Sequence, residues 1–248
     1  MSIVSIIMPT YNSESFILDT INSVVKQTFE SWELIIVDDC SSDNTVKIIK
    51  KKFGHDKRIH IFENEMNSGA GVSRNNGLIQ SKGKYIAFLD SDDIWHENKL
   101  EVQIDAMSKH DFDITHTSYS FINEDGTKAK GRVLVSDCVD LDSYMKNTEI
   151  GMSTAVINKE KVGDFQFNAM RTRQDTKLWL TLLAKGITSK GIDNELVYYR
   201  VRQGQISRNK LSVGFRTLKL YMTVKEISLW ERLYNFMFYT VNGFKKRM

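Results

Sequence analysis

The sequence has few of the features that would place it outside the ordinary globular proteins. Two cysteines, Cys40 and Cys138, make neither a disulfide framework nor a zinc-site spacing, so we expect two reduced thiols in a cytoplasmic protein. With a single proline and no low-complexity tract, no flexible linker is evident. No apolar run approaches the roughly 18 residues of a membrane-spanning helix. The opening MSIVSIIMPTYN lacks the preceding positive charge and the cleavage site of a signal peptide, and it is typical of a first strand.

Positive charge is concentrated near the end of the chain. Residues 200–248 hold 11 of the 34 Lys and Arg but only 2 of the 31 Asp and Glu, so the preceding residues are net acidic. Such a basic segment indicates an anionic partner, and a solvated helix face is the plainer alternative. Its aromatic residues favour an anionic membrane surface over nucleic acid, while packing on the domain or on a second copy in a homo-oligomer stays open.

Short β-rich runs alternate with helical patterns through the first half of the chain. We expect strands at residues 2–8, 33–37, 59–62 and 85–89, and helices at 14–26, 44–53 and 71–81. This order predicts an α/β fold with a mixed, mostly parallel sheet flanked by helices and right-handed crossovers. An antiparallel excursion over 112–135, a helix within 171–186 and a strand in NELVYYR follow.

Polar motifs follow the predicted strands, at the edge where parallel α/β sheets bind ligands. MPTYN follows the first strand, DDCSSDNT the second, NSGAGVSRN the third and DSDD the fourth, so we expect all four to converge on one rim. Each motif also has a plainer structural role. Ser42 or Asp43 can cap the next helix, Asp92 or Asp93 can cap a helix that begins near Glu97, and the glycines can allow close packing.

The DSDD motif places three carboxylates within four residues, Asp90, Asp92 and Asp93. Close carboxylates raise one another's pKa unless a positive group neutralises them. No Lys or Arg lies among them, so the local sequence leaves the partner open, and a metal ion is one candidate. Carboxylate oxygens suit Mg²⁺ or Mn²⁺ bound together with substrate phosphates. Arg74, in the third motif, can pair with a diphosphate or with one of these carboxylates.

Two further carboxylates admit a functional or a structural interpretation. Asp39 stands at the end of the second strand and suits contact with a base or a ribose, which helix capping does not explain. Asp175 begins an amphipathic helix, where the helix dipole stabilises a negative charge, or it acts as a general base near the rim. A phosphorylation receiver module is the rival function. It would use Asp39 and Asp90 but leaves MPTYN and Asp175 unexplained.

Five motifs together resemble family 2 glycosyltransferases. VSIIMPTYNSESFI, ELIIVDDCSSDNT, NSGAGVSRNNGL, YIAFLDSDDIW and RTRQDTKLWL occur in the order of that family, and the resemblance covers about residues 2–210. RTRQD and ISRNK are most similar to enzymes of bacterial surface polysaccharides, such as teichuronic acid or O-antigen. The resemblance implies a Rossmann-like GT-A domain over residues 1–210, followed by basic amphipathic helices over 211–248.

The resemblance also implies roles for individual residues. The donor site that it implies comprises Thr10, Tyr11, Asp39, Arg74, Asp90, Arg200 and Ser207, with the first three on the uridine and the last two in a loop that closes over the diphosphate. Asp90 and Asp92 form an Asp-x-Asp pair for Mn²⁺ or Mg²⁺, with Asp92 as the more direct ligand. Asp175 matches the catalytic base.

The implied reaction is an inverting, metal-dependent transfer. A hexose of the glucose or galactose type, with or without an N-acetyl group, moves from a UDP-sugar to a hydroxyl of a saccharide on a polyprenyl diphosphate. The expected place is the cytoplasmic face of the cell membrane.

Overall fold

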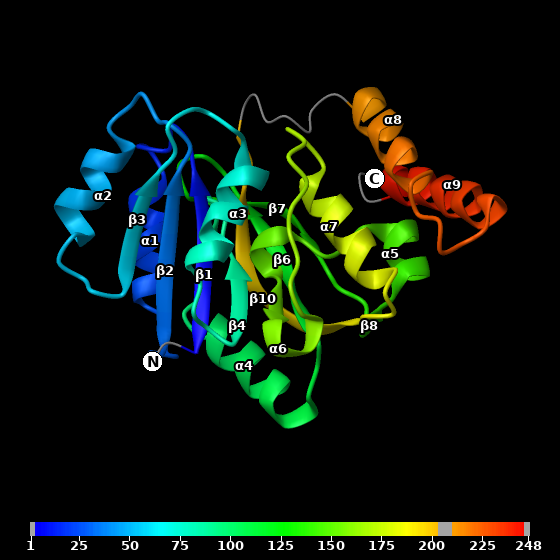
Figure 1. Cartoon of the computed structure of the whole chain (residues 1–248), viewed down its shortest axis with the longest axis horizontal. Coiled ribbons are helices and arrows are strands. Elements are labelled where there is room, and N and C mark those ends of the chain that lie inside the picture. The colour runs from blue at the N-terminus through cyan, green and yellow to red at the C-terminus, as the bar shows by residue number, and fades with distance from the viewer. Residues whose placement is uncertain (1–2, 203–209, 246–248) are drawn as a thin grey trace.

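The computed structural model describes residues 3–202 and 210–245 (Figure 1). The strands in these residues are β1 (Val4–Thr10), β2 (Trp32–Asp38), β3 (Ile59–Glu63), β4 (Tyr85–Phe88), β5 (Ile94–Trp95), β6 (Ile114–Ile122), β7 (Lys128–Val133), β8 (Cys138–Val139), β9 (Val156–Asn158) and β10 (Ser189–Arg200). The helices are α1 (Ile17–Val25), α2 (Thr45–Phe53), α3 (Ala70–Gln80), α4 (Lys99–His110), α5 (Leu141–Asn147), the 3₁₀ turn η1 (Met152–Thr154), α6 (Lys159–Val162), α7 (Gln174–Leu183), α8 (Lys210–Tyr221) and α9 (Leu229–Lys245).

One sheet runs through the molecule in the order β3-β2-β1-β4-β9-β6-β10-β5, with β7 added to β6 and β8 to β10. β3, β2, β1 and β4 are all parallel, as the alternating pattern predicted. Every residue of β1 and β2 is buried. Parallel strands covered on both faces are expected to carry continuous apolar runs, and the runs SIIM and LIIV have this form.

Two hydrophobic layers cover the two faces of the sheet, and alternate residues of β1 belong to each. Ile6 and Met8 pack with the layer that includes Ile17 of α1 and Leu100 of α4. Ile7 packs with the opposite layer, which includes Trp179 of α7. The two-residue period of a strand thus places one β1 residue toward each set of helices.

The second half of the chain makes the sheet mixed. β9 lies antiparallel between β4 and β6, and β5 pairs antiparallel with β10. The predicted excursion is confirmed, because β7 returns antiparallel along β6. Leu220, Tyr221 and Val224, at and after the end of α8, are buried in the same layer as α5 and α7. None of the helices among the described residues is long and apolar enough to cross a bilayer.

Candidate active site

The loops that follow β1, β2, β3 and β4 meet at one edge of the sheet. We call this edge the rim, and it comprises residues 10–13, 39–43, 64–74 and 90–93. The Asn12 N–H donates to Ser41 Oγ at 2.9 Å, and Asn12 Oδ1 accepts from the Ser42 N–H at 2.8 Å. Ser13 Oγ lies 2.8 Å from Ser91 Oγ in the DSDD loop. The first, second and fourth motifs are therefore joined side by side, as predicted.

Asp39 fastens the third motif to the same rim. Asp39 is only 3% exposed, and its carboxylate accepts from the backbone N–H groups of Ser68 at 2.8 Å and Gly69 at 2.7 Å. The side-chain amide of Asn64 donates a third hydrogen bond at 2.9 Å. A carboxylate has about four acceptor positions, so Asp39 retains acceptor capacity for a ligand. The convergence of all four motifs is confirmed.

The end of β1 carries two further features of a binding site. The Thr10 hydroxyl is buried and has no hydrogen-bond partner among the described residues, whereas Tyr11 is 49% exposed. Asn12 and Cys40 adopt left-handed backbone conformations, with φ of 46° and 65°, in the two loops that face each other. Such strained residues concentrate at functional sites. The roles of Thr10 and Tyr11 toward uridine stay predictions.

Of the helix-capping roles predicted for the motif residues, one is confirmed and one is wrong. Asp43 Oδ1 accepts a hydrogen bond from the N–H of Thr45, the first residue of α2, at 2.9 Å. The predicted hydrogen bond from Asp43 to the start of that helix is therefore confirmed, although Asn44 occupies the N-cap position. The capping role expected of Asp92 or Asp93 is wrong. The next helix, α4, starts only at Lys99, because β5 follows the DSDD loop directly.

The carboxylates of Asp90 and Asp92 are neutralised by arginines that lie far away in the sequence. Asp90 Oδ1 accepts from Nη2 of the buried Arg74 at 2.5 Å. Asp92 Oδ2 lies 2.8 Å from Nε of Arg202, although this N–H does not point along a hydrogen bond to it. The question left open by the sequence thus has two answers, Arg74, which was predicted, and Arg202, which was not.

Asp93 is the most deeply buried member of the motif, and its surroundings could not be predicted from the local sequence. It is 2% exposed, and it accepts hydrogen bonds from the Ser153 hydroxyl at 2.6 Å and from the Arg200 backbone N–H at 3.2 Å. Ser153 Oγ also accepts from the Asp90 N–H at 3.1 Å. Ser153, in η1, therefore joins both ends of the DSDD loop.

Burial disfavours the charged forms of Asp92 and Asp93 despite the neighbouring arginines. Burial raises the pKa of Asp92, and the nearby Asp90 carboxylate raises it further, while Arg202 opposes the rise. Burial also raises the pKa of Asp93 well above its usual range, assisted by Asp92 and Asp90. A group whose charge is disfavoured in this way gains from an added cation.

Arg74 has unused hydrogen-bonding capacity. It is 3% exposed and lies with its guanidinium carbon 5.4 Å from the centre of the Phe167 ring. Beyond its contact with Asp90, Nε and Nη1 have no hydrogen-bond partner among the described residues. Buried N–H groups without acceptors are costly, so this arginine suits an anionic ligand such as a diphosphate.

Asp175 lies in the first turn of α7, next to the rim, and is partly buried. The start of α7 approaches the start of α3 closely, and both begin near the upper edge of Figure 1. A Cβ atom added to Gly71 would lie 2.7 Å from the Asn168 carbonyl oxygen and 3.3 Å from Gln174 Cγ, so this glycine is needed for the approach. Arg173, just before the helix, has φ of 65°. The catalytic role of Asp175 stays a prediction.

Arg200 ends β10 and is almost fully buried beneath the DSDD loop. Its Nε donates to the Asp92 carbonyl at 2.9 Å, and its Nη1 donates to the Glu124 carbonyl at 2.8 Å. Asp19 of α1 lies 3.6 Å from Nη2. Arg200 therefore connects the rim to the β6–β7 turn. Its contact with a diphosphate stays a prediction. Ser207, predicted in the same loop, lies outside the described residues.

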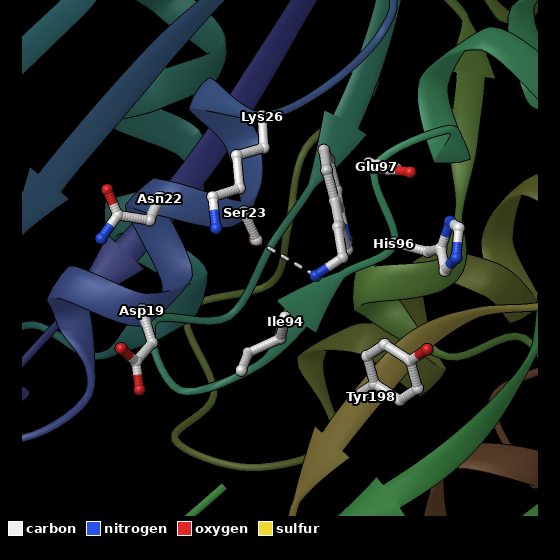
Figure 2. A pocket seen from close by; sticks show the side chains of 9 residues that line it. Asp19, Asn22, Ser23, Lys26, Ile94, His96, Glu97 and Tyr198 are labelled. Carbon is white, nitrogen blue, oxygen red and sulfur yellow. Dashed lines mark hydrogen bonds between the residues drawn. The ribbon is translucent and has the colours of Figure 1, made fainter.

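A pocket of about 390 Å³ lies beside the site, against β5, the strand that follows the DSDD loop (Figure 2). Asp19 and Asn22 of α1, with Lys26 directly after this helix, line one side, and residues 94–97 with Tyr198 line the other. The Trp95 N–H donates to Ser23 Oγ at 3.2 Å, which joins the two sides of the pocket. None of the predicted site residues lines this pocket.

The donor set at the rim fits a divalent metal that a substrate helps to bind. Within residues 3–202 and 210–245, no three Asp, Glu, His or Cys side chains form a group that holds a metal by itself. Mg²⁺ and Mn²⁺ sites of nucleotide enzymes use one or two carboxylates, with phosphate oxygens and waters as the other ligands. Asp90 and Asp92, two carboxylates separated by one residue in the DSDD loop, match that pattern.

Comparison with known proteins decides the family. Residues 5–181 match the sequence profile of the family "Glycosyl transferase family 2". The chain belongs to this family. The predicted enzyme class, an inverting hexosyltransferase of family 2, is confirmed at the level of the family, and the rival prediction of a receiver module is wrong.

Relatives of this family 2 glycosyltransferase cover nearly its whole length. TuaG, assigned to teichuronic acid biosynthesis in Bacillus subtilis, is 39% identical over 99% of this chain and 98% of its own. WfgD of Escherichia coli, a UDP-Glc:α-D-GlcNAc-diphosphoundecaprenol β-1,3-glucosyltransferase, is 37% identical over 98% of this chain and 94% of its own. The two relatives agree with the predicted class of bacterial polysaccharide enzymes.

A solved structure supports the predicted GT-A fold of this glycosyltransferase. TarS 1–349 of S. aureus in complex with UDP-GlcNAc aligns with a TM-score of 0.76, at 21% identity, over 99% of this chain and 73% of that one. At this identity the likeness concerns the fold.

Proposed function

We propose that this enzyme transfers a hexose of the glucose or galactose type, with or without an N-acetyl group, from a UDP-sugar to a saccharide on a polyprenyl diphosphate. The observation that carries the proposal is the convergence of Asp39, Arg74, Asp90 and Asp92 on one rim, with Asp175 beside it. The substrates named for WfgD, and the UDP-GlcNAc bound by TarS, support this choice. Such an acceptor would place the reaction at the inner face of the cell membrane.

The donor is proposed to lie along the rim with its base near β1 and β2. The remaining acceptor capacity of Asp39 suits the N–H edge of uracil, and the unpartnered Thr10 hydroxyl suits a polar atom of the nucleoside. The exposed ring of Tyr11 offers a flat surface for stacking. The free N–H groups of Arg74 suit the diphosphate.

The chemistry is proposed as a direct displacement at the anomeric carbon. Asp175 takes the proton of the acceptor hydroxyl. At the same time the oxygen of that hydroxyl forms a bond to the anomeric carbon, and the bond between this carbon and the UDP oxygen breaks. One carboxylate on the acceptor side favours inversion, so an α-linked donor gives a β-glycoside. Asp90 and Asp92 would hold Mn²⁺ or Mg²⁺, which when bound supplies positive charge for the departing diphosphate. Arg74 lies beside Asp90 and adds to that charge.

The test is release of UDP from a panel of UDP-sugars, with Mn²⁺ or with EDTA, using a synthetic acceptor in which an amino sugar is linked to a lipid diphosphate. We expect metal-dependent release with one donor, and product analysis that shows a β-linkage. Absence of release from every donor, together with absence of UDP binding by calorimetry, would overturn the proposal.

A further inference from the structure

Helix α9 exposes an unusual amount of apolar surface. Of the fifteen large apolar side chains that are exposed among the described residues, six lie on this helix of 17 residues. Five of them recur every three or four residues and so share one face, and we call this face the outer stripe: Trp230, Leu233, Tyr234, Met237 and Val241. Trp230 is 80% exposed, and Tyr234 and Met237 are each more than half exposed.

The opposite face of α9 is apolar as well, and it is the face that packs on the protein. The Phe236 and Tyr239 rings each lie 6.1 Å from the ring of Tyr221, and Asn235 is 1% exposed. A surface helix normally turns a polar face to water, and a helix that is apolar all round is covered on both sides. The packing of α9 on this chain therefore covers only one of its two apolar faces.

We propose that the outer stripe is the surface by which this enzyme lies on an anionic lipid bilayer. The stripe itself carries no charge, and Glu231 in the first turn and Arg232 are the charged residues of α9 before Lys245. Basic residues lie beside it, since Lys146 of α5 has its Nζ 5.6 Å from the centre of the Tyr234 ring, and in the sequence Lys245, Lys246 and Arg247 follow the stripe directly. An interfacial helix with Trp and Tyr at the boundary and basic residues beside it has this composition.

The same charge argues against a second copy of the chain as the occupant. A symmetric dimer through the outer stripe would bring the Lys146 side chains of both copies to the interface, because both copies use the same surface. Like charges that face one another oppose association, whereas an acidic membrane surface attracts each Lys and Arg near it.

The inner face of α9 connects the proposed membrane contact to the site. Arg173, which stands two residues before Asp175, donates from Nη2 to the Tyr239 hydroxyl at 2.8 Å. Lys177, on the next turn of α7, donates to Thr223 Oγ1 at 3.0 Å. A bilayer at the outer stripe would thus hold α7 at a fixed height above the lipid, where a polyprenyl-linked acceptor lies. This last step rests on the proposed function, while the membrane contact stands on α9 alone.

The test is co-sedimentation of the full chain with vesicles, without donor or acceptor. Vesicles of phosphatidylglycerol and phosphatidylcholine in equal parts are compared with phosphatidylcholine alone. We expect binding to the anionic vesicles that weakens as salt is added. The double variant Trp230→Ser, Met237→Ser should bind about 100-fold more weakly, since each large apolar side chain withdrawn from water contributes roughly tenfold. The matched control is Ile79→Ser on α3, because Ile79 is apolar and 77% exposed.

The outcomes separate this proposal from its alternatives. Equal binding by the double variant and by the Ile79→Ser control, or no vesicle binding by the unmodified chain, would overturn it. A dimer in light scattering that the double variant converts to a monomer would identify a second copy as the occupant and overturn it too. UDP release with an acceptor on a short, soluble alkyl chain should be unchanged in the double variant. Failure of that reaction in the unmodified chain would count against the proposed function and not against the membrane contact.

Discussion

Replacing Arg202 with alanine is expected to change metal binding and nucleotide binding in opposite directions. The Arg202 side chain is 35% exposed, and its Nε lies 2.8 Å from Oδ2 of Asp92, whose side chain is 14% exposed. The contact is an ion pair without a directed hydrogen bond, so an incoming cation of higher charge can replace it. In Arg202→Ala the guanidinium no longer competes with a metal for the carboxylate of Asp92, the proposed metal ligand. A bound diphosphate, by contrast, loses one positively charged neighbour.

The expected magnitude follows from the exposure of the pair. Partly exposed ion pairs contribute about 1 kcal/mol, which corresponds to roughly a fivefold change in a dissociation constant. We therefore expect Mn²⁺ to bind about fivefold more tightly to Arg202→Ala in the absence of nucleotide, and UDP to bind about fivefold more weakly in the absence of metal. Arg202 lowers the pKa of Asp92, so this pKa rises further in Arg202→Ala, and both titrations are repeated at increasing pH until the Mn²⁺ affinity no longer changes.

The assay is a titration of free Mn²⁺ by electron paramagnetic resonance, paired with calorimetry of UDP in EDTA. Arg132→Ala is the matched control, because Arg132 also forms a surface ion pair, with Glu195 at 3.0 Å, but on β7 away from the rim. It should leave both affinities unchanged. Weaker Mn²⁺ binding by Arg202→Ala in the absence of nucleotide would refute the idea that this arginine occupies the metal ligand.

Three further predictions concern the base, the metal pair and a buried lysine. Asp175→Asn should bind UDP normally in calorimetry but lose transfer by about 10²–10⁴-fold; normal turnover would place the base elsewhere. Asp92→Ala should lose the gain in UDP affinity that Mn²⁺ gives, and a retained gain would remove Asp92 from the metal site. Burial lowers the pKa of Lys99 well below its usual value, so above its folded pKa the folded state binds fewer protons than the unfolded state and stability rises with pH toward the unfolded pKa. Lys99→Met should flatten that rise in urea unfolding between pH 7 and 10, and an unchanged slope would assign the dependence to other groups.

The first half of the fold could be predicted because its signals are local. The buried parallel strands β1, β2 and β4 carry continuous apolar runs, and the helices between the strands repeat at helical spacing. β9 and β5 were missed because they have three and two residues, which is too short for any period. Their places are fixed by antiparallel pairing with β4, β6 and β10, strands that lie far away in the chain.

The site divides in the same way between local and distant information. The position of each motif after a strand predicted the rim, since parallel strands end at one edge. The partners of the aspartates could not be predicted so directly. Ser153 carries no motif, and it meets Asp93 only because η1 leads into β9 beside β4. Arg202 had one usable signal, because it stands between Arg200 and Ser207 in a segment already predicted to close over the donor.

The arrangement of charges gives these arginines a common property. Arg74 and Arg202 each contact one aspartate of the DSDD loop, and each has at least one N–H without a hydrogen-bond acceptor among the described residues. Fully satisfied ion pairs would favour the empty site and oppose substrate binding. Incompletely satisfied pairs have the opposite effect, because the arginines gain hydrogen bonds from a diphosphate and the aspartates gain from a divalent cation. We therefore expect donor and metal to bind cooperatively. A bound metal releases the arginines from the aspartates for the diphosphate, and a bound diphosphate releases the aspartates from the arginines for the metal. Calorimetry of UDP with and without Mn²⁺ measures this coupling, and independent binding of the two would contradict it.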